Sequence, residues 1–128
     1  MEVSYLRNMG FILILLALLF SWVLVVYRYI LKVDAQKVNT EYILKAHIDF
    51  LLMGILLIAF SFLGGKVSPY LILFTCIGTV TNPAMFLVMA FNPKVDKSPT
   101  SIFGLTTTIS YVITTIGIGG LCITYLLA

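Results

Sequence analysis

The chain of 128 residues is strongly apolar, since 61% of its residues are hydrophobic, 10% are charged and the mean hydropathy is +1.11. These values exclude a water-soluble domain and indicate an integral membrane protein. The net charge of +3 does not indicate nucleic-acid binding, because the basic residues are scattered at the ends of apolar segments. No linker rich in Ser, Gly or Pro divides the sequence, so we expect a single transmembrane domain over residues 1–128.

Four apolar segments predict an all-α fold, an integral membrane four-helix bundle. The first segment resembles a signal peptide, but its apolar run Gly10 to Tyr27 is long and no cleavage site of small residues follows, so we expect a retained helix. Asn39 or Thr40 is the expected N-cap of the second helix, which Gly64 and Gly65 are expected to end. The predicted helices span about residues 5–32, 41–63, 68–91 and 100–127.

The positions of Lys and Arg predict how the chain is oriented in the membrane. Six basic residues lie in or beside the loops after the first and third helices: Arg28, Lys32, Lys37, Lys45, Lys94 and Lys97. Only Arg7 and Lys66 lie toward the opposite ends. By the positive-inside rule, we expect loops 33–40 and 92–99 in the cytoplasm and both termini outside, in the plasma membrane of a bacterium or archaeon.

His47 is the single histidine and lies in the apolar second helix. An ionisable residue inside a transmembrane helix indicates a functional site, and a neutral imidazole is the usual axial ligand of haem iron. Gly54 follows about 10 Å along the same helix face, so we expect open space there for a wide planar group. Lys45 and Arg28 are nearby cations that suit haem propionates. These residues favour a haem, with His47 on the iron, over a zinc site, since no cluster of Cys, His, Asp and Glu accompanies His47.

Other interpretations of the polar residues stay open at this stage. The His47 ring has a structural alternative, in which it only donates a hydrogen bond to a backbone carbonyl. Asp49 faces about 200° away from His47, and we expect it to pair with Lys45 one turn earlier rather than to carry protons. Asn82 precedes Pro83, which leaves a helix carbonyl without its usual N–H, and the Asn82 amide either joins two helices or lines a binding pocket.

The fourth helix carries a stripe of small residues that predicts close approach of another helix, from the same chain or from a neighbour. This small-residue stripe consists of Gly104, Thr108, Thr115, Gly119 and Cys122. Both cysteines, Cys76 and Cys122, lie in apolar runs without metal-binding spacing, so we expect buried, inert thiols.

Two segments, AHIDFLLMG at residues 46–54 and TNPAMFLVMAFNP at residues 81–93, resemble the styrene oxide isomerase family of small four-helix membrane proteins. The resemblance implies a trimer that binds haem b through His47 between neighbouring subunits. It also implies that the iron acts as a Lewis acid on an epoxide oxygen, so that the epoxide isomerises to a carbonyl compound.

The match to the family is partial. His47, Gly54, Asn82 and Pro93 agree with the family pattern. Three polar positions of the family are apolar here: its Asn before the glycine falls on Met53, its helix 3 Asp on Gly78 and its helix 3 Tyr on Phe86. The haem ligand is therefore kept while the groups that position the substrate are lost. The expected pocket residues are Met53, Gly78, Asn82, Met85 and Phe86.

Two functions follow from these observations. The first is a homo-oligomeric membrane haem b protein that either isomerises a small lipophilic substrate such as an epoxide or senses a small ligand. The second belongs to another class, a cofactor-free accessory or scaffold subunit of a membrane complex, in which the polar residues at the helix ends have no chemical role. A visible spectrum of the purified protein distinguishes the two.

Overall fold

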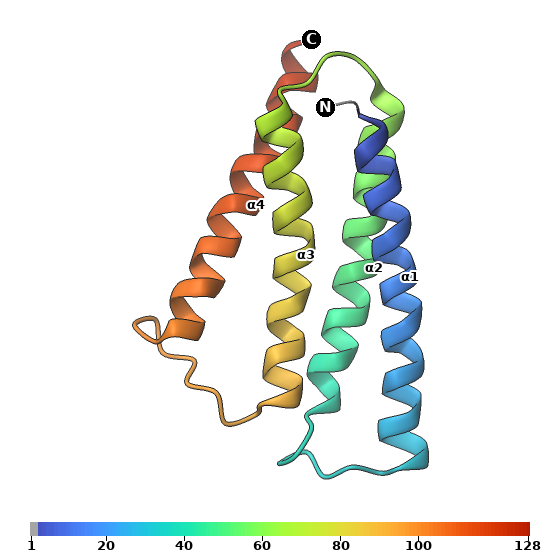
Figure 1. Ribbon diagram of the computed structural model, residues 1–128, viewed down its shortest axis with the longest axis vertical. Coiled ribbons are helices and arrows are strands. Elements are labelled where there is room, and N and C mark those ends of the chain that lie inside the picture. The colour runs from blue at the N-terminus through green and yellow to red at the C-terminus, as the bar shows by residue number, and fades with distance from the viewer. Residues whose placement is uncertain (1–2) are drawn as a thin grey trace.

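A computed structural model of the protein describes residues 3–128. These residues form α1 (Ser4–Val25), α2 (Thr40–Leu63), α3 (Pro69–Phe91) and α4 (Ile102–Leu127), and a π-helical turn, η1 (Val26–Ile30), extends α1 (Figure 1). Each of the four spans is long and apolar enough to cross a membrane. The predicted all-α fold with four transmembrane segments is confirmed.

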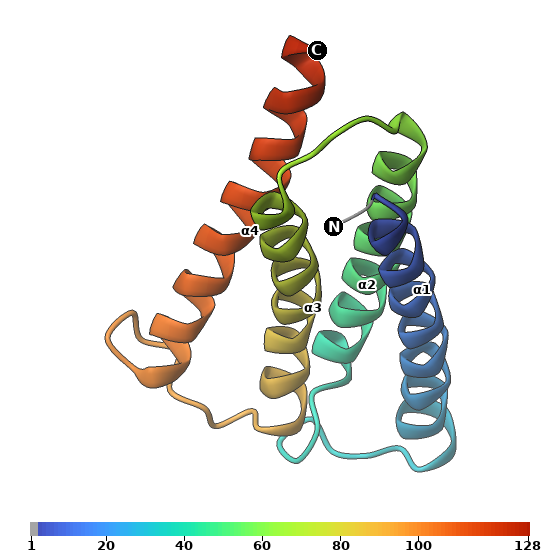
Figure 2. The same cartoon turned by 45° about the horizontal axis from the view of Figure 1, so that its top comes forward.

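The helices stand in a row rather than in a closed ring. α1 packs on α2, α2 on α3 and α3 on α4, so that α1 and α4 occupy the two ends of the row (Figures 1 and 2). The start of α1 and the end of α4 lie at one end of the bundle, which we call the terminal end. The loops 31–39 and 92–101 lie at the other end, which we call the loop end. Even numbers of membrane crossings place the termini on one side in this way.

Local sequence signals set the boundaries of the helices. The Asn39 side chain accepts a hydrogen bond from the Glu41 backbone N–H at 3.1 Å, so the predicted N-cap of α2 is confirmed. Gly64 and Gly65 end α2 with φ of +65° and +85°, a conformation that residues with a Cβ rarely adopt. Pro69 opens α3, where its missing N–H costs nothing.

The last turn of the first span differs from the sequence prediction, which had an α-helix to about residue 32. In η1 the helix widens, and the Leu31 N–H donates to the Val26 carbonyl five residues earlier at 2.8 Å. Arg28 lies in this turn and donates from its Nε and Nη2 atoms to Thr40 Oγ1 at 3.4 and 3.3 Å. The turn therefore attaches the end of the first span to the start of α2.

Two glycines bring α1 and α2 into backbone contact. A Cβ atom built on Gly10 would lie 2.7 Å from the Gly54 carbonyl oxygen, and one built on Gly54 would lie 2.8 Å from the Gly10 carbonyl oxygen. Real Cβ atoms do not come that close to a backbone oxygen, so only glycine fits at either position. Small residues at such contacts are the usual means by which transmembrane helices approach each other closely.

Glycines also join α3 to α4, where they face threonines. A Cβ on Gly78 would lie 2.7 Å from Thr114 Cα, and a Cβ on Gly117 would lie 2.5 Å from the Thr75 backbone nitrogen. The small-residue stripe predicted on α4 therefore does not make this contact. Within the described chain, nothing lies within 4 Å of a Cβ built on Gly119, so that stripe faces away from the other helices at Gly119.

Candidate functional site

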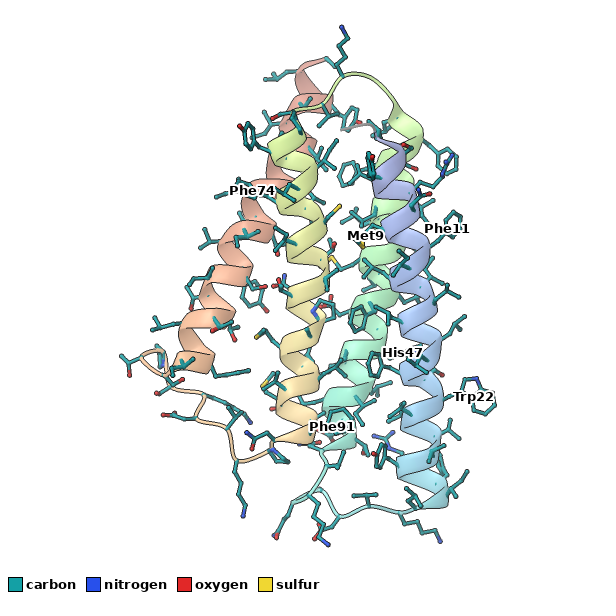
Figure 3. The ribbon with its side chains drawn as sticks, viewed as in Figure 1. Met9, Phe11, Trp22, His47, Phe74 and Phe91 are labelled. Carbon is teal, nitrogen blue, oxygen red and sulfur yellow. The ribbon has the colours of Figure 1, made fainter. Side chains whose placement is uncertain are left out.

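His47 lies on the α1 side of α2, at the seam between the two helices (Figure 3). Its Nδ1 atom is 2.6 Å from the Ala17 carbonyl oxygen in α1. A carbonyl oxygen only accepts, so Nδ1 carries the proton in this contact, and the neutral ring then has its lone pair on Nε2. Among residues 3–128, no group bonds to Nε2. The ring is half-buried, held at one nitrogen and available at the other.

The open space predicted beside Gly54 is absent, and that prediction is wrong. α1 occupies the space, since Gly10 and Ile14 lie against the position where a Gly54 Cβ would be. The sequence shows that a glycine leaves room but not what fills the room. In this fold Gly54 admits a helix backbone, so any planar group bound to His47 must lie elsewhere than on Gly54.

The two cations predicted to accompany His47 separate in the structure. Arg28 bonds to Thr40, which lies seven residues before His47 and therefore on the same face of α2, about 10 Å along the axis. Lys45 lies about 200° around the helix from His47, and its Nζ atom sits 4.9 Å from the centre of the Tyr42 ring. Within one chain, Arg28 is therefore on the His47 side and Lys45 is not.

Asp49 and Lys45 do not form the predicted ion pair. Lys45 turns to the Tyr42 ring instead, and across residues 3–128 the Asp49 carboxyl has neither a hydrogen bond nor an ion pair. An ammonium group over the face of an aromatic ring is attracted by the ring electrons, so Lys45 is stabilised there without a carboxylate. Asp49 lies seven residues after Tyr42 and so on the same face, which meets α3 where Tyr42 stacks on Phe86 with ring centres 6.4 Å apart.

Asn82 joins α3 to α4 through hydroxyl groups. Ser110 Oγ donates to Asn82 Oδ1 at 2.5 Å and is itself 2.6 Å from Thr81 Oγ1. Because the Ser110 proton is used on Asn82, Thr81 is the donor in the second bond. No group in the described part of the chain accepts from the Asn82 amide N–H₂. Asn82 Oδ1 thus links α3 to α4, while the Asn82 N–H₂ group keeps two donors for another partner.

The remaining predicted pocket residues have mostly packing roles within the chain. Gly78 faces Thr114 in the α3–α4 contact, and Phe86 stacks on Tyr42. Met53 and Met85 are half-buried. One chain does not bring this set to His47, because His47 contacts α1 and Asn82 contacts α4, at opposite ends of the row. Both residues belong to apolar helices, but the sequence does not fix which neighbouring helix each side chain meets.

An apolar cavity of about 280 Å³ lies between α1 and α3 and includes Met9, Ile72 and Cys76 in its lining. None of the site residues predicted from the sequence lines this cavity. Sequence reasoning missed it because it depends on the pairing of α1 with α3. Cys76 is half-buried with a free thiol, whereas Cys122 is exposed, so the prediction that both thiols are buried is wrong for Cys122.

Sequence reasoning also missed Ser110 and Tyr42 as site residues. Ser110 lies on a different face of α4 from the predicted small-residue stripe, and only the pairing with Asn82 singles it out. Tyr42 has the weak signal of an aromatic residue at the start of a transmembrane helix, where such residues are common.

The described residues hold no group of three or more His, Cys, Asp and Glu side chains that would bind a bare metal ion. His47 therefore belongs to no such group in the described part of the chain. Comparison of the chain with protein-family models, with curated proteins and with solved structures finds no match.

Proposed function

We propose that this protein is an integral membrane haem b protein in which His47 Nε2 is the axial iron ligand. The observation that carries the proposal is the 2.6 Å contact between His47 Nδ1 and the Ala17 carbonyl oxygen. Histidines that bind metals usually donate their other ring N–H to a carbonyl or carboxylate, which fixes the tautomer and the ring orientation. Here that arrangement lies inside a transmembrane helix pair.

The residues around His47 suit a haem that reaches toward the loop end. Arg28 supplies a guanidinium on the same face of α2 as His47 and uses two of its N–H groups on Thr40. Its other donors remain for a propionate, since Arg has five. Arg28 therefore takes the propionate role in this proposal, and Lys45 does not share it within the same chain.

The proposal includes a homo-oligomer, a trimer as in the styrene oxide isomerases that the two segments resemble. One chain keeps His47 and Asn82 apart, so a neighbouring copy is needed to bring an Asn82 amide to a His47. The free N–H₂ of Asn82 is then a donor for the polar atom of a small lipophilic substrate or ligand that enters from the bilayer. When bound through His47, a ferric haem would supply a Lewis acid for an epoxide oxygen, and the proposed activity is therefore epoxide-to-carbonyl isomerisation or, without turnover, sensing of a small ligand.

A visible spectrum of the detergent-purified protein, expressed with supplemented haem, tests the proposal. We expect a Soret band at stoichiometric intensity that shifts on reduction with dithionite. His47→Ala removes the band, and Arg28→Gln weakens haem retention because it removes a propionate partner. Asp49→Asn is the matched control, since this residue is on the same helix but faces away from His47. A His47→Ala variant that retains haem contradicts the ligand assignment.

A second candidate is a cofactor-free accessory subunit, and the outer face of α4 favours it. Gly119 has open space where a Cβ would be, and Thr115 and Cys122 of the same stripe are exposed. A small-residue face without a partner in the described chain suits a helix of another protein. A flat visible spectrum together with a stoichiometric co-purifying membrane protein supports this candidate, and Gly119→Leu then releases the partner.

A further inference from the structure

Two lysines from distant parts of the chain meet on one tyrosine ring at the loop end. Lys45 lies in α2 and Lys97 in the loop between α3 and α4. Their Nζ atoms are 4.9 and 5.0 Å from the centre of the Tyr42 ring, and Lys97 Nζ is 3.5 Å from the Tyr42 hydroxyl. The two ammonium groups are therefore no farther apart than these two ring distances together.

Neither ammonium group has an acidic partner in the described residues. Asp96 is next to Lys97 in sequence, but its carboxylate accepts from the Ser98 backbone N–H at 2.9 Å. Asp49 lies one turn from Lys45 and makes no ion pair. Two like charges that contact the same ring repel each other, and an anion that contacts both converts that repulsion into two attractions. The arrangement thus has the positive charge that an anion site requires.

The face of α2 that follows Lys45 toward the terminal end indicates which kind of molecule the anionic group belongs to. An exposed stripe of α2 continues from Lys45 along the helix through Ile48, Leu52 and Ile55, which are 46%, 60% and 52% exposed. These positions share one face by helical spacing. A cationic group at the end of a transmembrane helix with an apolar stripe beneath it matches the headgroup and the acyl chain of a lipid.

We propose that Lys45, Lys97 and the Tyr42 hydroxyl bind the phosphate group of an anionic phospholipid, whose acyl chain lies along the exposed stripe of α2. The two ammonium groups hold the phosphate oxygens, and the Tyr42 hydroxyl donates the third bond. The ring also keeps the two cations gathered while it stacks on Phe86 of α3. Because one side of the site is the α3–α4 loop, the bound lipid joins that loop to α2. The site faces away from His47 and does not depend on haem binding.

Native mass spectrometry of the purified full chain measures the preference for phosphatidylglycerol over phosphatidylcholine directly. Removal of one charge near the membrane surface should weaken phosphatidylglycerol binding about fivefold. We expect this loss in Lys45→Gln and in Lys97→Gln, and a larger loss in the double variant. Tyr42→Leu leaves both charges in place but removes the ring that gathers them, so it should lower the preference as well. Lys97 is an exposed loop residue, and its variant keeps the test decisive if Lys45→Gln fails to fold.

Two controls separate a built site from general surface charge. Lys37→Gln removes a charge at the same end of the bundle, and Lys66→Gln removes one at the terminal end, and both should keep the phosphatidylglycerol preference. An equal loss in Lys37→Gln overturns the proposal in favour of diffuse attraction. Inorganic phosphate should not displace the lipid at millimolar concentration, and full displacement would mean a site for free phosphate. Equal binding of both lipids to the unaltered chain also contradicts the proposal.

Discussion

The helix pairs α1–α2 and α3–α4 both pack closely through glycines, but they differ in the number and hydrogen bonding of the polar side chains between the helices. In α1–α2, Gly10 and Gly54 bring two backbones together, and His47, which bonds to the Ala17 carbonyl across the seam, keeps a nitrogen without a partner among residues 3–128. In α3–α4, Gly78 and Gly117 face threonines. The serine and threonine hydroxyls between α3 and α4 are bonded, and we call them a closed polar seam, beside which the Asn82 amide N–H₂ has no partner among residues 3–128. The α1–α2 seam is mostly apolar, and His47 Nε2 offers a lone pair there.

The threonines of α3–α4 show how hydroxyl groups become suitable for a membrane interior. Thr75 donates to the Leu71 carbonyl at 2.7 Å, and Thr114 donates to the Ser110 carbonyl at 2.8 Å. Each hydroxyl is satisfied by its own helix one turn back, which leaves a small, nearly apolar surface for the facing glycine. The polar residues of α3–α4 therefore mostly serve helix packing, while the isolated His47 of α1–α2 is the better candidate for a functional residue.

The largest expected effect comes from Gly54→Val, which breaks the α1–α2 pair. The new Cβ would meet the Gly10 carbonyl oxygen at 2.8 Å, and a backbone atom cannot move aside as a side chain does. We expect a loss of about 3 kcal/mol or more in the free energy of unfolding, measured by thermal or denaturant unfolding in detergent. Gly119→Ala is the control, since its Cβ has open space and alanine favours a helix. Equal stability of both variants would show that α1 and α2 do not pack through this glycine.

The existence and extent of the helices were predictable from the sequence, because bilayer thickness sets a minimum apolar length and few residue types end a helix. The predicted α2 and α3 limits differ from the observed ones by one residue at most. The π-helical turn η1 was not predictable. Its backbone N–H groups donate to the carbonyl five residues earlier instead of four, and this change leaves the apolar pattern of the segment unchanged. The N-cap Asn39 and the turn at Gly64 were predictable because each depends on local chemistry alone.

The candidate site was predictable only as a set of residue types. His47 stood out because it is unique and ionisable, but its partner Ala17 contributes only a backbone atom, which no sequence pattern marks. The interaction of Lys45 with Tyr42 in place of Asp49 depends on a side-chain competition within one helix turn. The separation of His47 from Asn82 depends on which helices are neighbours. Helical periodicity gives the angle between residues of one helix but not the identity of the helix that each face meets.

Ser110→Ala tests whether α3–α4 is a closed polar seam. The variant removes the donor to Asn82 Oδ1 and the acceptor for Thr81, so we expect a loss of about 1 to 2 kcal/mol in the free energy of unfolding. The double variant Ser110→Ala, Asn82→Leu removes both partners and should recover part of that loss. No change in stability for Ser110→Ala would mean that the hydroxyl chain contributes nothing to the pairing of α3 with α4.

Tyr125→Phe tests a link between the two helix pairs at the terminal end. The Tyr125 hydroxyl in α4 donates to the Gly64 carbonyl oxygen at 2.9 Å, just after α2. Loss of this single bond should cost about 0.5 to 1 kcal/mol. The comparison variant is Tyr111→Phe, whose side chain is exposed and has no such bond in the described chain. A larger effect from Tyr111→Phe than from Tyr125→Phe would contradict the assignment.

The smallest effect concerns the loop that joins α3 to α4, at Asp96. Hydrogen bonding from the Ser98 backbone N–H favours the ionised carboxyl and holds the pKa of Asp96 below its ordinary value of 3.8. A depressed pKa in the folded state means that the contribution to stability is present above the unfolded pKa and is lost as the pH falls through the folded pKa. Asp96→Asn should therefore lower the melting temperature slightly at pH 7 and leave it unchanged relative to the parent at the acid end of the profile. A melting temperature that falls equally at pH 7 and at the acid end would contradict this assignment, because the effect would then not depend on the ionised carboxylate of Asp96.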